Sequence, residues 1–262
     1  MAQDKFQGSR FEQKYVVTEE NALQIRDFVR NHLELDGHAV GKPNYSYPVH
    51  SLYLDSDDLK LYWSTINGDG NRFKMRLRFY DDNPETPVFL EIKERTNNLI
   101  LKKRAPVRRD SMNGLLTGQM DDPSHVTGRK HFGALEDFCE RMYELDARPK
   151  VHIAYSREAY MSGDDNSFRL TMDREVRVEL ARSPLPRGEG QSEGQTSSPV
   201  QLITAMQNPT LIWGRDVVLE AKFTDCLPEM FRDLVRIFGL RQCGAAKYVD
   251  GVATLGEYKL PR

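Results

Sequence analysis

Basic residues alternate with apolar residues in several short segments of the chain. In residues 72–80, Lys74, Arg76 and Arg78 fall on even positions, while the odd positions are apolar. A β-strand sends alternate side chains to opposite faces, so this segment predicts a strand with one apolar face and one basic face. Like charges in a row repel each other, and such a face needs carboxylates or a bound anion nearby.

The same alternation recurs in other segments. It adds the cations Lys14, Lys93, Lys102, Arg104, Arg157, Arg169 and Lys222, and the carboxylates Glu12, Glu91, Asp173 and Glu220. Guanidinium groups match phosphate oxygens in geometry. If these faces meet, they predict a site for a phosphate chain.

The carboxylates suggest a metal as well. Glu91 and Glu220 each precede a lysine by two residues, on the same predicted strand face. Hard oxygen ligands suit Mg²⁺ or Mn²⁺, and a divalent ion would offset phosphate charge and polarise a phosphoryl group. The alternative is that each glutamate is the ion-pair partner of a lysine.

Charged strand faces also occur on ordinary solvated sheets, where cross-strand pairs contribute only about 0.2–1 kcal/mol. That interpretation loses weight here because the pattern recurs on six or seven segments while helices are available to cover the apolar sides. A closed barrel wrapped by helices would direct its charged residues into the lumen.

The elements that would position these residues are short strands and a few helices. Strands are predicted at 10–17, 49–55, 72–80, 88–95, 100–107, 151–160, 168–174, 176–180 and 217–223. Helices are predicted at 18–36, 135–145 and 228–238, with weaker signals at 59–66 and 201–207. This order predicts a largely antiparallel α+β protein. Residues 183–199, which are rich in Gly, Ser and Pro, predict a flexible surface loop inside a single domain spanning 1–262.

Composition narrows the class of protein. A net charge of −2 argues against a general nucleic-acid binder. Cys139, Cys226 and Cys243 lack CxxC or Cys/His spacing, which favours a reducing compartment over a disulfide framework or a zinc site. The chain has no signal-like apolar stretch and no apolar run near the ~20 residues of a membrane span, so we expect a cytoplasmic location.

Taken in order, these segments resemble the VTC domain, the polyphosphate polymerase domain of the vacuolar transporter chaperone complex. The matching segments are RFEQKY (10–15), SLYLDS (51–56), RFKMRLRFY (72–80), LEIKER (90–95), LKKR (101–104), YSREAY (155–160), FRLTMDR (168–174), LEAKF (219–223) and AKYVDG (246–251). That domain belongs to the triphosphate tunnel metalloenzymes, which are related to the CYTH phosphatases. The resemblance implies a closed antiparallel tunnel of about eight strands flanked by helices.

By motif, the resemblance assigns family tunnel positions to Lys14, Arg76, Arg78, Lys93, Arg157, Arg169 and Lys247, and the metal position to Glu220. Lys74, Lys102 and Arg104 fit less closely. The family motif often has a serine before its last lysine, whereas Ala246 precedes Lys247 here. One hydroxyl contact to phosphate is therefore expected to be missing.

The working hypothesis is transfer of the terminal phosphoryl group of ATP to a polyphosphate chain. The expected catalytic residues are Lys14, Arg76, Arg78, Lys93 and Lys222, and the expected phosphate-binding residues are Lys74, Lys102, Arg104, Arg157, Arg169 and Lys247. Glu220 and Glu12 are the expected ligands of Mn²⁺ or Mg²⁺.

The expected partners are ATP or another triphosphate and polyphosphate, with no nucleic acid; a membrane partner stays open. Three alternatives use the same residues. They are hydrolysis of triphosphates, non-catalytic sensing of polyphosphate or nucleotide, and general binding of polyanions.

Overall fold

The computed structural model describes residues 10–97, 99–116, 126, 128–163, 167–182, 202–224 and 226–260. The chain forms two compact units, each with its own apolar core. The first unit comprises Met1–Val49, Tyr155–Arg177 and Leu211–Asp250, and the second comprises His50–Ala154, Val178–Thr210 and Gly251–Arg262. The loop predicted at 183–199 lies outside the described residues, and the single domain over 1–262 stays a prediction.

Ten strands of the described chain belong to one sheet. They are β1 (Arg10–Val17), β2 (Glu34–Leu35), β3 (Ser46–Asp55), β4 (Asn71–Phe79), β5 (Val88–Thr96), β6 (Leu99–Val107), β7 (Arg148–Met161), β8 (Phe168–Leu180), β9 (Thr210–Leu211) and β10 (Val217–Thr224). Their hydrogen-bonded order is β1-β10-β8-β7-β3-β4-β5-β6, with β2 beside β7 and β9 beside β8. The predicted α+β class with a large antiparallel sheet is thus confirmed.

The helices are α1 (Glu19–Val29), α2 (Lys60–Ile66), α3 (Met112–Leu116), α4 (Phe132–Glu144), α5 (Glu229–Ile237) and α6 (Lys247–Leu255). Thr18 caps α1 and accepts a hydrogen bond from the Asn21 N–H at 3.3 Å. The helix ends at Val29 rather than near residue 36, because Glu34 and Leu35 pair with β7.

The helix predicted at 201–207 is wrong for its described part, residues 202–207, which contain no helical segment. The Thr204 N–H bonds to Asp82 at 2.7 Å, and the Gln207 N–H bonds to Glu179 at 2.7 Å. Side-chain carboxylates therefore take the place of the i→i−4 carbonyls that a helix would use.

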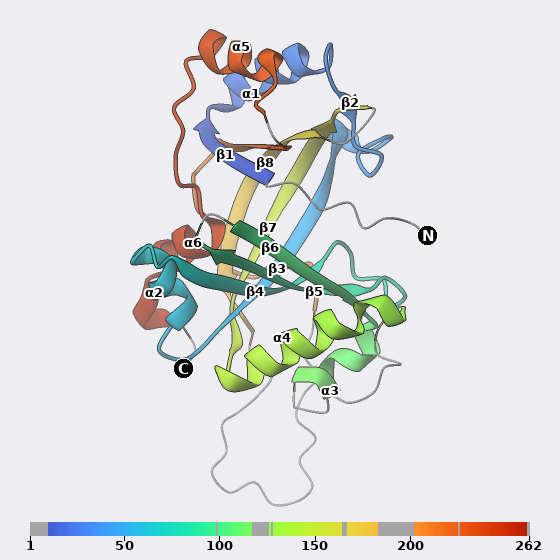
Figure 1. Cartoon of the computed structure of the whole chain (residues 1–262), viewed down its shortest axis with the longest axis vertical. Coiled ribbons are helices and arrows are strands. Elements are labelled where there is room, and N and C mark those ends of the chain that lie inside the picture. Colours follow the sequence, from blue (N-terminus) through green and yellow to red (C-terminus); the bar gives the residue numbers. More distant parts are fainter. Residues whose placement is uncertain are drawn as a thin grey trace, which may run out of the picture. The chain divides into compact units, whose positions relative to one another are not determined.

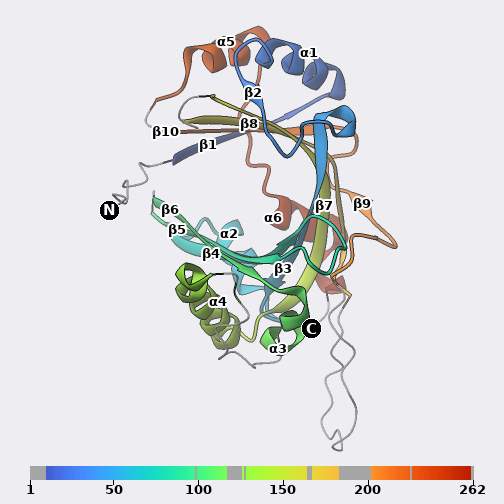
Figure 2. The same cartoon turned by 90° about the vertical axis from the view of Figure 1, so that its right-hand side faces the viewer.

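In the first unit, α1 and α5 cover one face of β1, β8 and β10 (Figures 1 and 2). Tyr15, Leu170 and Leu219 on the strands are buried with Ile25 of α1 and Phe231 of α5. Burying an apolar side chain of this size contributes about 1.5–3 kcal/mol. The apolar side chains of these strands thus face the helices, and the charged side chains point to the opposite face.

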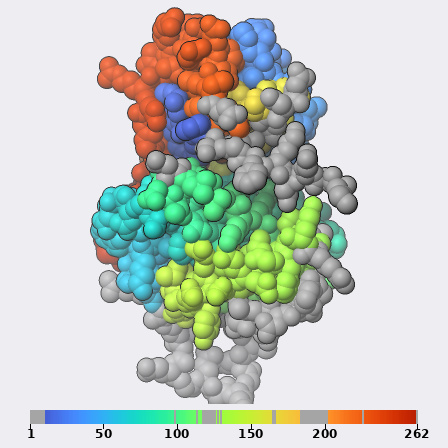
Figure 3. All heavy atoms as spheres, in the orientation of Figure 1, coloured from blue at the N-terminus to red at the C-terminus, as the bar shows by residue number. Residues whose placement is uncertain are grey.

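In the second unit, α3 and α4 lie against one face of β4, β5 and β6 (Figure 2). Met75, Leu77 and Leu90 are buried in the same core as Leu135 and Phe138 of α4. In the space-filling view, the yellow-green atoms of α4 lie next to the teal and green atoms of these strands (Figure 3). The even residues of β4 therefore lie on the face away from α4.

Candidate functional site

Cross-strand rows of polar side chains lie on the helix-free face of the second unit. One row consists of Tyr53, Arg76, Glu91 and Arg104, and the next consists of Lys74, Lys93 and Lys102. Directly opposite residues in an antiparallel pair have Cβ atoms about 4.5–5.5 Å apart. The register therefore brings residues from four strands to one place.

Glu91 is the centre of this face. Its side chain is 2% exposed, and four cations lie within 4 Å of its carboxylate: Arg76 at 2.7 Å, Lys102 at 2.8 Å, Arg104 at 3.2 Å and Arg78 at 3.9 Å. Burial would raise the pKa of the Glu91 carboxyl, but the neighbouring cations outweigh burial and lower it. One ionised carboxylate cannot neutralise four cations, so this group, named here the Glu91 cluster, is net positive.

Two ionisable neighbours respond to that positive charge. Tyr53 accepts a hydrogen bond from Arg76 at 3.0 Å. Burial would raise the pKa of the Tyr53 phenol, but Arg76 and Arg78 lower it to about 8. Burial also lowers the pKa of Lys102 to about 7; Arg76 and Arg78 act in the same direction, and Glu91 opposes them. The Tyr53 shift reflects the positive charge of Arg76 and Arg78, whereas the Lys102 shift reflects mainly burial.

In the first unit, carboxylates and lysines alternate across β1, β10 and β8. One row holds Glu12, Lys222 and Arg169, and the other holds Lys14, Glu220 and Thr171. The Lys14 ammonium lies 3.0 Å from Glu12 and 3.9 Å from Glu220. Lys222 also pairs with Glu220. Two carboxylates thus converge on one cationic position.

Asp173 holds a second group of cations in the first unit. Its buried carboxylate accepts two hydrogen bonds from Arg157, at 2.7 and 2.8 Å, and lies 2.7 Å from the Lys247 ammonium. The Tyr155 ring lies 5.1 Å from the Arg157 guanidinium and 4.9 Å from that ammonium. Burial would raise the pKa of Asp173, but Arg157 and Lys247 lower it to about 2. The carboxylate therefore stays charged and fixes both cations.

The two units differ in charge balance. In the first unit, the predicted cations each contact a carboxylate, and the remaining pair joins Arg169 to Asp36. In the second unit, the Glu91 cluster has four cations on a single carboxylate. The Glu91 cluster therefore keeps more uncompensated positive charge than the cation groups of the first unit.

The donor set around Lys14 fits a hard divalent cation. Mg²⁺ and Mn²⁺ are commonly held by one or two carboxylates together with phosphate oxygens. Glu12 and Glu220 supply such a pair, although no cluster of three or more His, Cys, Asp or Glu within the described ranges is arranged to hold a metal. Thr171, opposite Glu220, adds a buried hydroxyl without a hydrogen-bond partner in the described chain. A cation here would need further ligands from a bound phosphate.

The structure divides the predicted site residues between the two units. Lys74, Arg76, Arg78, Lys93, Lys102 and Arg104 lie on β4, β5 and β6; Glu12, Lys14, Arg157, Arg169, Glu220, Lys222 and Lys247 lie on β1, β7, β8, β10 and the start of α6. Glu91 fits its alternative interpretation as an ion-pair partner, but its lysine contact is Lys102 on the next strand. The roles of all these residues stay predictions.

Three residues that contact the site were not predicted as part of it. Tyr53 could have been found, because it alternates with apolar residues in SLYLDS. Thr171 shares a strand face with Arg169 and was visible in the same way. Asp36 carries no such signal, because it follows the two-residue strand β2 outside any alternating segment.

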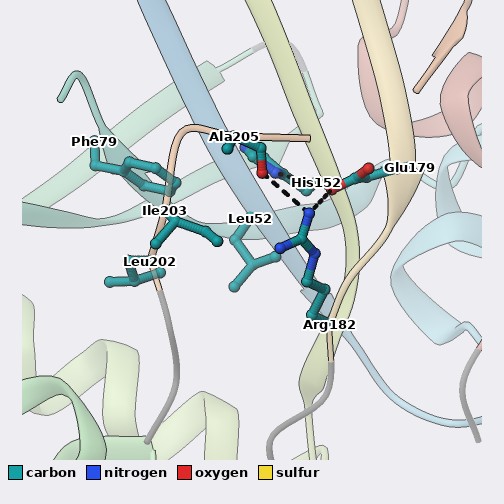
Figure 4. Close-up of a pocket in the computed structure, with 8 residues that line it drawn as sticks. All are labelled: Leu52, Phe79, His152, Glu179, Arg182, Leu202, Ile203 and Ala205. Carbon is teal, nitrogen blue, oxygen red and sulfur yellow. Dashed lines mark hydrogen bonds and ion pairs between the residues drawn. The ribbon is translucent and has the colours of Figure 1, made fainter. Parts of the chain in front are cut away.

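A small cavity lies on another part of the second unit (Figure 4). His152, which lines it, has its Nε2 atom 3.1 Å from Nδ1 of His50. Glu179 accepts backbone hydrogen bonds from Gln207 and Asn208 at 2.7 and 3.1 Å. Glu179 therefore anchors the segment at 207–208 to β8, which fits a role in stability.

Comparison with known proteins decides the family. The sequence model of the VTC domain matches residues 9–256, nearly the whole chain. The chain belongs to the VTC domain family. Vacuolar transporter chaperone complex subunit 4 of Schizosaccharomyces pombe is 23% identical over 269 residues, covering 92% of this VTC domain and 37% of the relative. The Trypanosoma cruzi subunit 4 is 26% identical over 159 residues, covering 50% and 19%.

This VTC domain thus spans less than two fifths of the length of these relatives. A solved structure of a Pyrococcus horikoshii OT3 protein is 12% identical and covers 94% of this chain and 99% of its own, with a TM-score of 0.45. Among the described residues, no helix has both the length and the apolar character needed to cross a bilayer.

Proposed function

We propose that this chain is a metal-dependent phosphotransferase that moves the terminal phosphoryl group of ATP onto a polyphosphate chain. The observation that carries the proposal is the Glu91 cluster, where four cations share one buried carboxylate. Cations that outnumber the nearby carboxylates repel each other, and a bound anion would offset that repulsion. A phosphate chain offers many oxygens along its length, and Arg forks match them.

Positioning and charge neutralisation supply most of the catalysis in phosphoryl transfer. Arg76, Arg78, Lys102 and Arg104 would bind phosphate oxygens, with Lys74 and Lys93 in the adjacent row extending the binding surface. A terminal oxygen of the polyphosphate chain forms a bond to the γ-phosphorus of ATP. The bond between that phosphorus and the β,γ-bridging oxygen breaks, and ADP leaves.

The first unit would contribute the carboxylates. Glu12 and Glu220 would hold Mn²⁺ or Mg²⁺, and the ion would neutralise phosphate charge during transfer. Lys14 and Lys222 already contact these carboxylates and would turn to phosphate oxygens. Arg157, Arg169 and Lys247 would bind further phosphates from positions fixed by Asp173 and Asp36.

Membership of the VTC domain family supports a tunnel as the place of this reaction. In the closed tunnel that the resemblance implies, the charged faces would line one lumen; that closure remains part of the proposal. Cys139, Cys226 and Cys243 form no disulfide within the described residues, which fits the proposed cytoplasmic location.

Incubation with ATP and Mn²⁺ tests the proposal. Polyphosphate that grows with time while ADP is released would support phosphoryl transfer. Free phosphate without polymer would overturn it in favour of hydrolysis, and tight tripolyphosphate binding without turnover would favour a sensor. Arg76→Ala should lower the rate by at least about 100-fold. Arg236→Ala, on an 82% exposed side chain of α5, is the matched control and should leave the rate unchanged.

A further inference from the structure

Thr171 presents a buried hydroxyl on the charged face of the first unit. The residue is 1% exposed, and its Oγ1 atom has no hydrogen-bond partner in the described chain. Most buried side-chain polar atoms in proteins are hydrogen-bonded, and leaving one unsatisfied is unfavourable. The hydroxyl therefore calls for an explanation beyond packing.

The side chain of Thr171 points to the face that carries the Glu220 carboxylate. Thr171 lies between the buried residues Leu170 and Met172, which pack under the helices, so its own side chain points to the opposite face. It is directly opposite Glu220 in the β8–β10 pair, and Glu220 is opposite Lys14 on β1. Directly opposite residues have Cβ atoms about 4.5–5.5 Å apart. A hydroxyl and a carboxylate at that spacing can bind one ion, because Mg²⁺ binds oxygens at about 2.0–2.1 Å.

We propose that the Thr171 hydroxyl is a direct ligand of the divalent cation held by Glu12 and Glu220. The inference rests on the metal site of the proposed function and adds a neutral oxygen to its two carboxylates. A neutral ligand completes coordination without adding negative charge that would repel phosphate. The unsatisfied hydroxyl lowers the stability of the metal-free protein. It is satisfied when the cation binds, and it thereby raises the affinity for the cation.

Two substitutions separate ligand binding from packing. Thr171→Val keeps the branched shape but removes the hydroxyl, and Thr171→Ser keeps the hydroxyl. After removal of metal with EDTA, thermal unfolding should show Thr171→Val melting about 2–4 °C above wild type. Mn²⁺ titration, followed by the electron paramagnetic resonance signal of free Mn²⁺, should show about tenfold weaker binding to that variant. Thr171→Ser should bind Mn²⁺ nearly as wild type does.

Several results would overturn the inference. A metal-free Thr171→Val protein that melts below wild type would mean that the hydroxyl has a structural partner. Unchanged Mn²⁺ affinity in Thr171→Val, with wild type binding Mn²⁺ and Glu220→Gln not binding it, would reject this ligand while leaving the proposed metal site intact. Loss of affinity for tripolyphosphate alone, measured in EDTA, would place the hydroxyl on phosphate and reject the assignment. Failure of the wild-type protein to bind Mn²⁺ would reject the metal site of the proposed function as well.

Discussion

Arg76 lies directly opposite Glu91 in the antiparallel β4–β5 pair, and their charged groups are 2.7 Å apart. This pair explains how a strand with successive cations on one face folds without a ligand. A single buried carboxylate offsets part of the repulsion and leaves the rest to attract an anion. The cluster thus forms without a ligand and keeps a net positive charge.

Glu91→Gln should destabilise the chain while keeping the size of the side chain. Four cations would face a neutral amide, and we expect the free energy of unfolding in urea to fall by about 3 kcal/mol. Tripolyphosphate should restore more stability to this variant than it adds to wild type. Glu94→Gln, which removes a partly exposed pair with Arg141, should cost less than about 1 kcal/mol. Equal losses in the two variants would contradict a central role for Glu91.

The pKa of about 7 at Lys102 predicts pH-dependent binding. The ammonium is charged below that pH and neutral above it, so affinity for tripolyphosphate should fall as pH rises from about 6 to about 8. Calorimetric titrations should show that protonation of Lys102 changes the affinity for tripolyphosphate about tenfold. Lys102→Arg keeps its charge throughout, and its smaller pH dependence corrects for titration of the ligand. The same slope in both proteins would refute the assignment.

Asp173→Asn should cost about 3–5 kcal/mol in free energy of unfolding, because Arg157 and Lys247 would lose their buried partner. The pKa of about 2 lies below the usual value of 3.8, so ionised Asp173 stabilises the fold at neutral pH. That contribution is lost as pH falls from about 4 through about 2. Acid unfolding followed by circular dichroism should reveal it. Glu175→Gln, in an exposed pair with Arg177, should leave the acid midpoint unchanged.

The buried His152 should make a second acid-sensitive contribution to the free energy of unfolding. Burial is the main cause that lowers the pKa of this imidazole to about 4, with Arg182 acting in the same direction. The unfolded chain takes up a proton near pH 6.5 and the folded chain does not, so stability should fall by up to about 3 kcal/mol between about pH 6.5 and pH 4. His152→Gln should flatten this slope in urea unfolding series. The exposed His32→Gln should keep it, and an unchanged slope in His152→Gln would exclude this origin.

The strand faces could be predicted from sequence because alternation depends on each strand alone. Register could not, since it is set by packing between strands. The sequence therefore indicated that Arg76 and Glu91 each lie on charged faces, but not that they are opposite each other. For the same reason, the sequence allowed an ion pair of Glu91 with a lysine but could not identify it as Lys102 on β6.

Local helix signals explain two further differences between the predicted and the observed helices. Asp36 was placed at the end of a long helix, but β2 interrupts that segment and the carboxylate accepts a hydrogen bond from Arg169. Helix α6 was not predicted, because Gly251 lies inside its short segment and glycine disfavours helix interiors by about 1 kcal/mol. Lys247 begins this helix, which positions its ammonium at Asp173.

A crystal structure with a non-hydrolysable triphosphate analogue and Mn²⁺ would show whether the Glu91 cluster binds phosphate. We expect phosphate oxygens within hydrogen-bond distance of Arg76, Arg78, Lys102 and Arg104, and anomalous scattering from Mn²⁺ at Glu12 and Glu220. An analogue bound away from the Glu91 cluster, or a cluster that retains its ion pairs with no phosphate contact, would contradict this expectation.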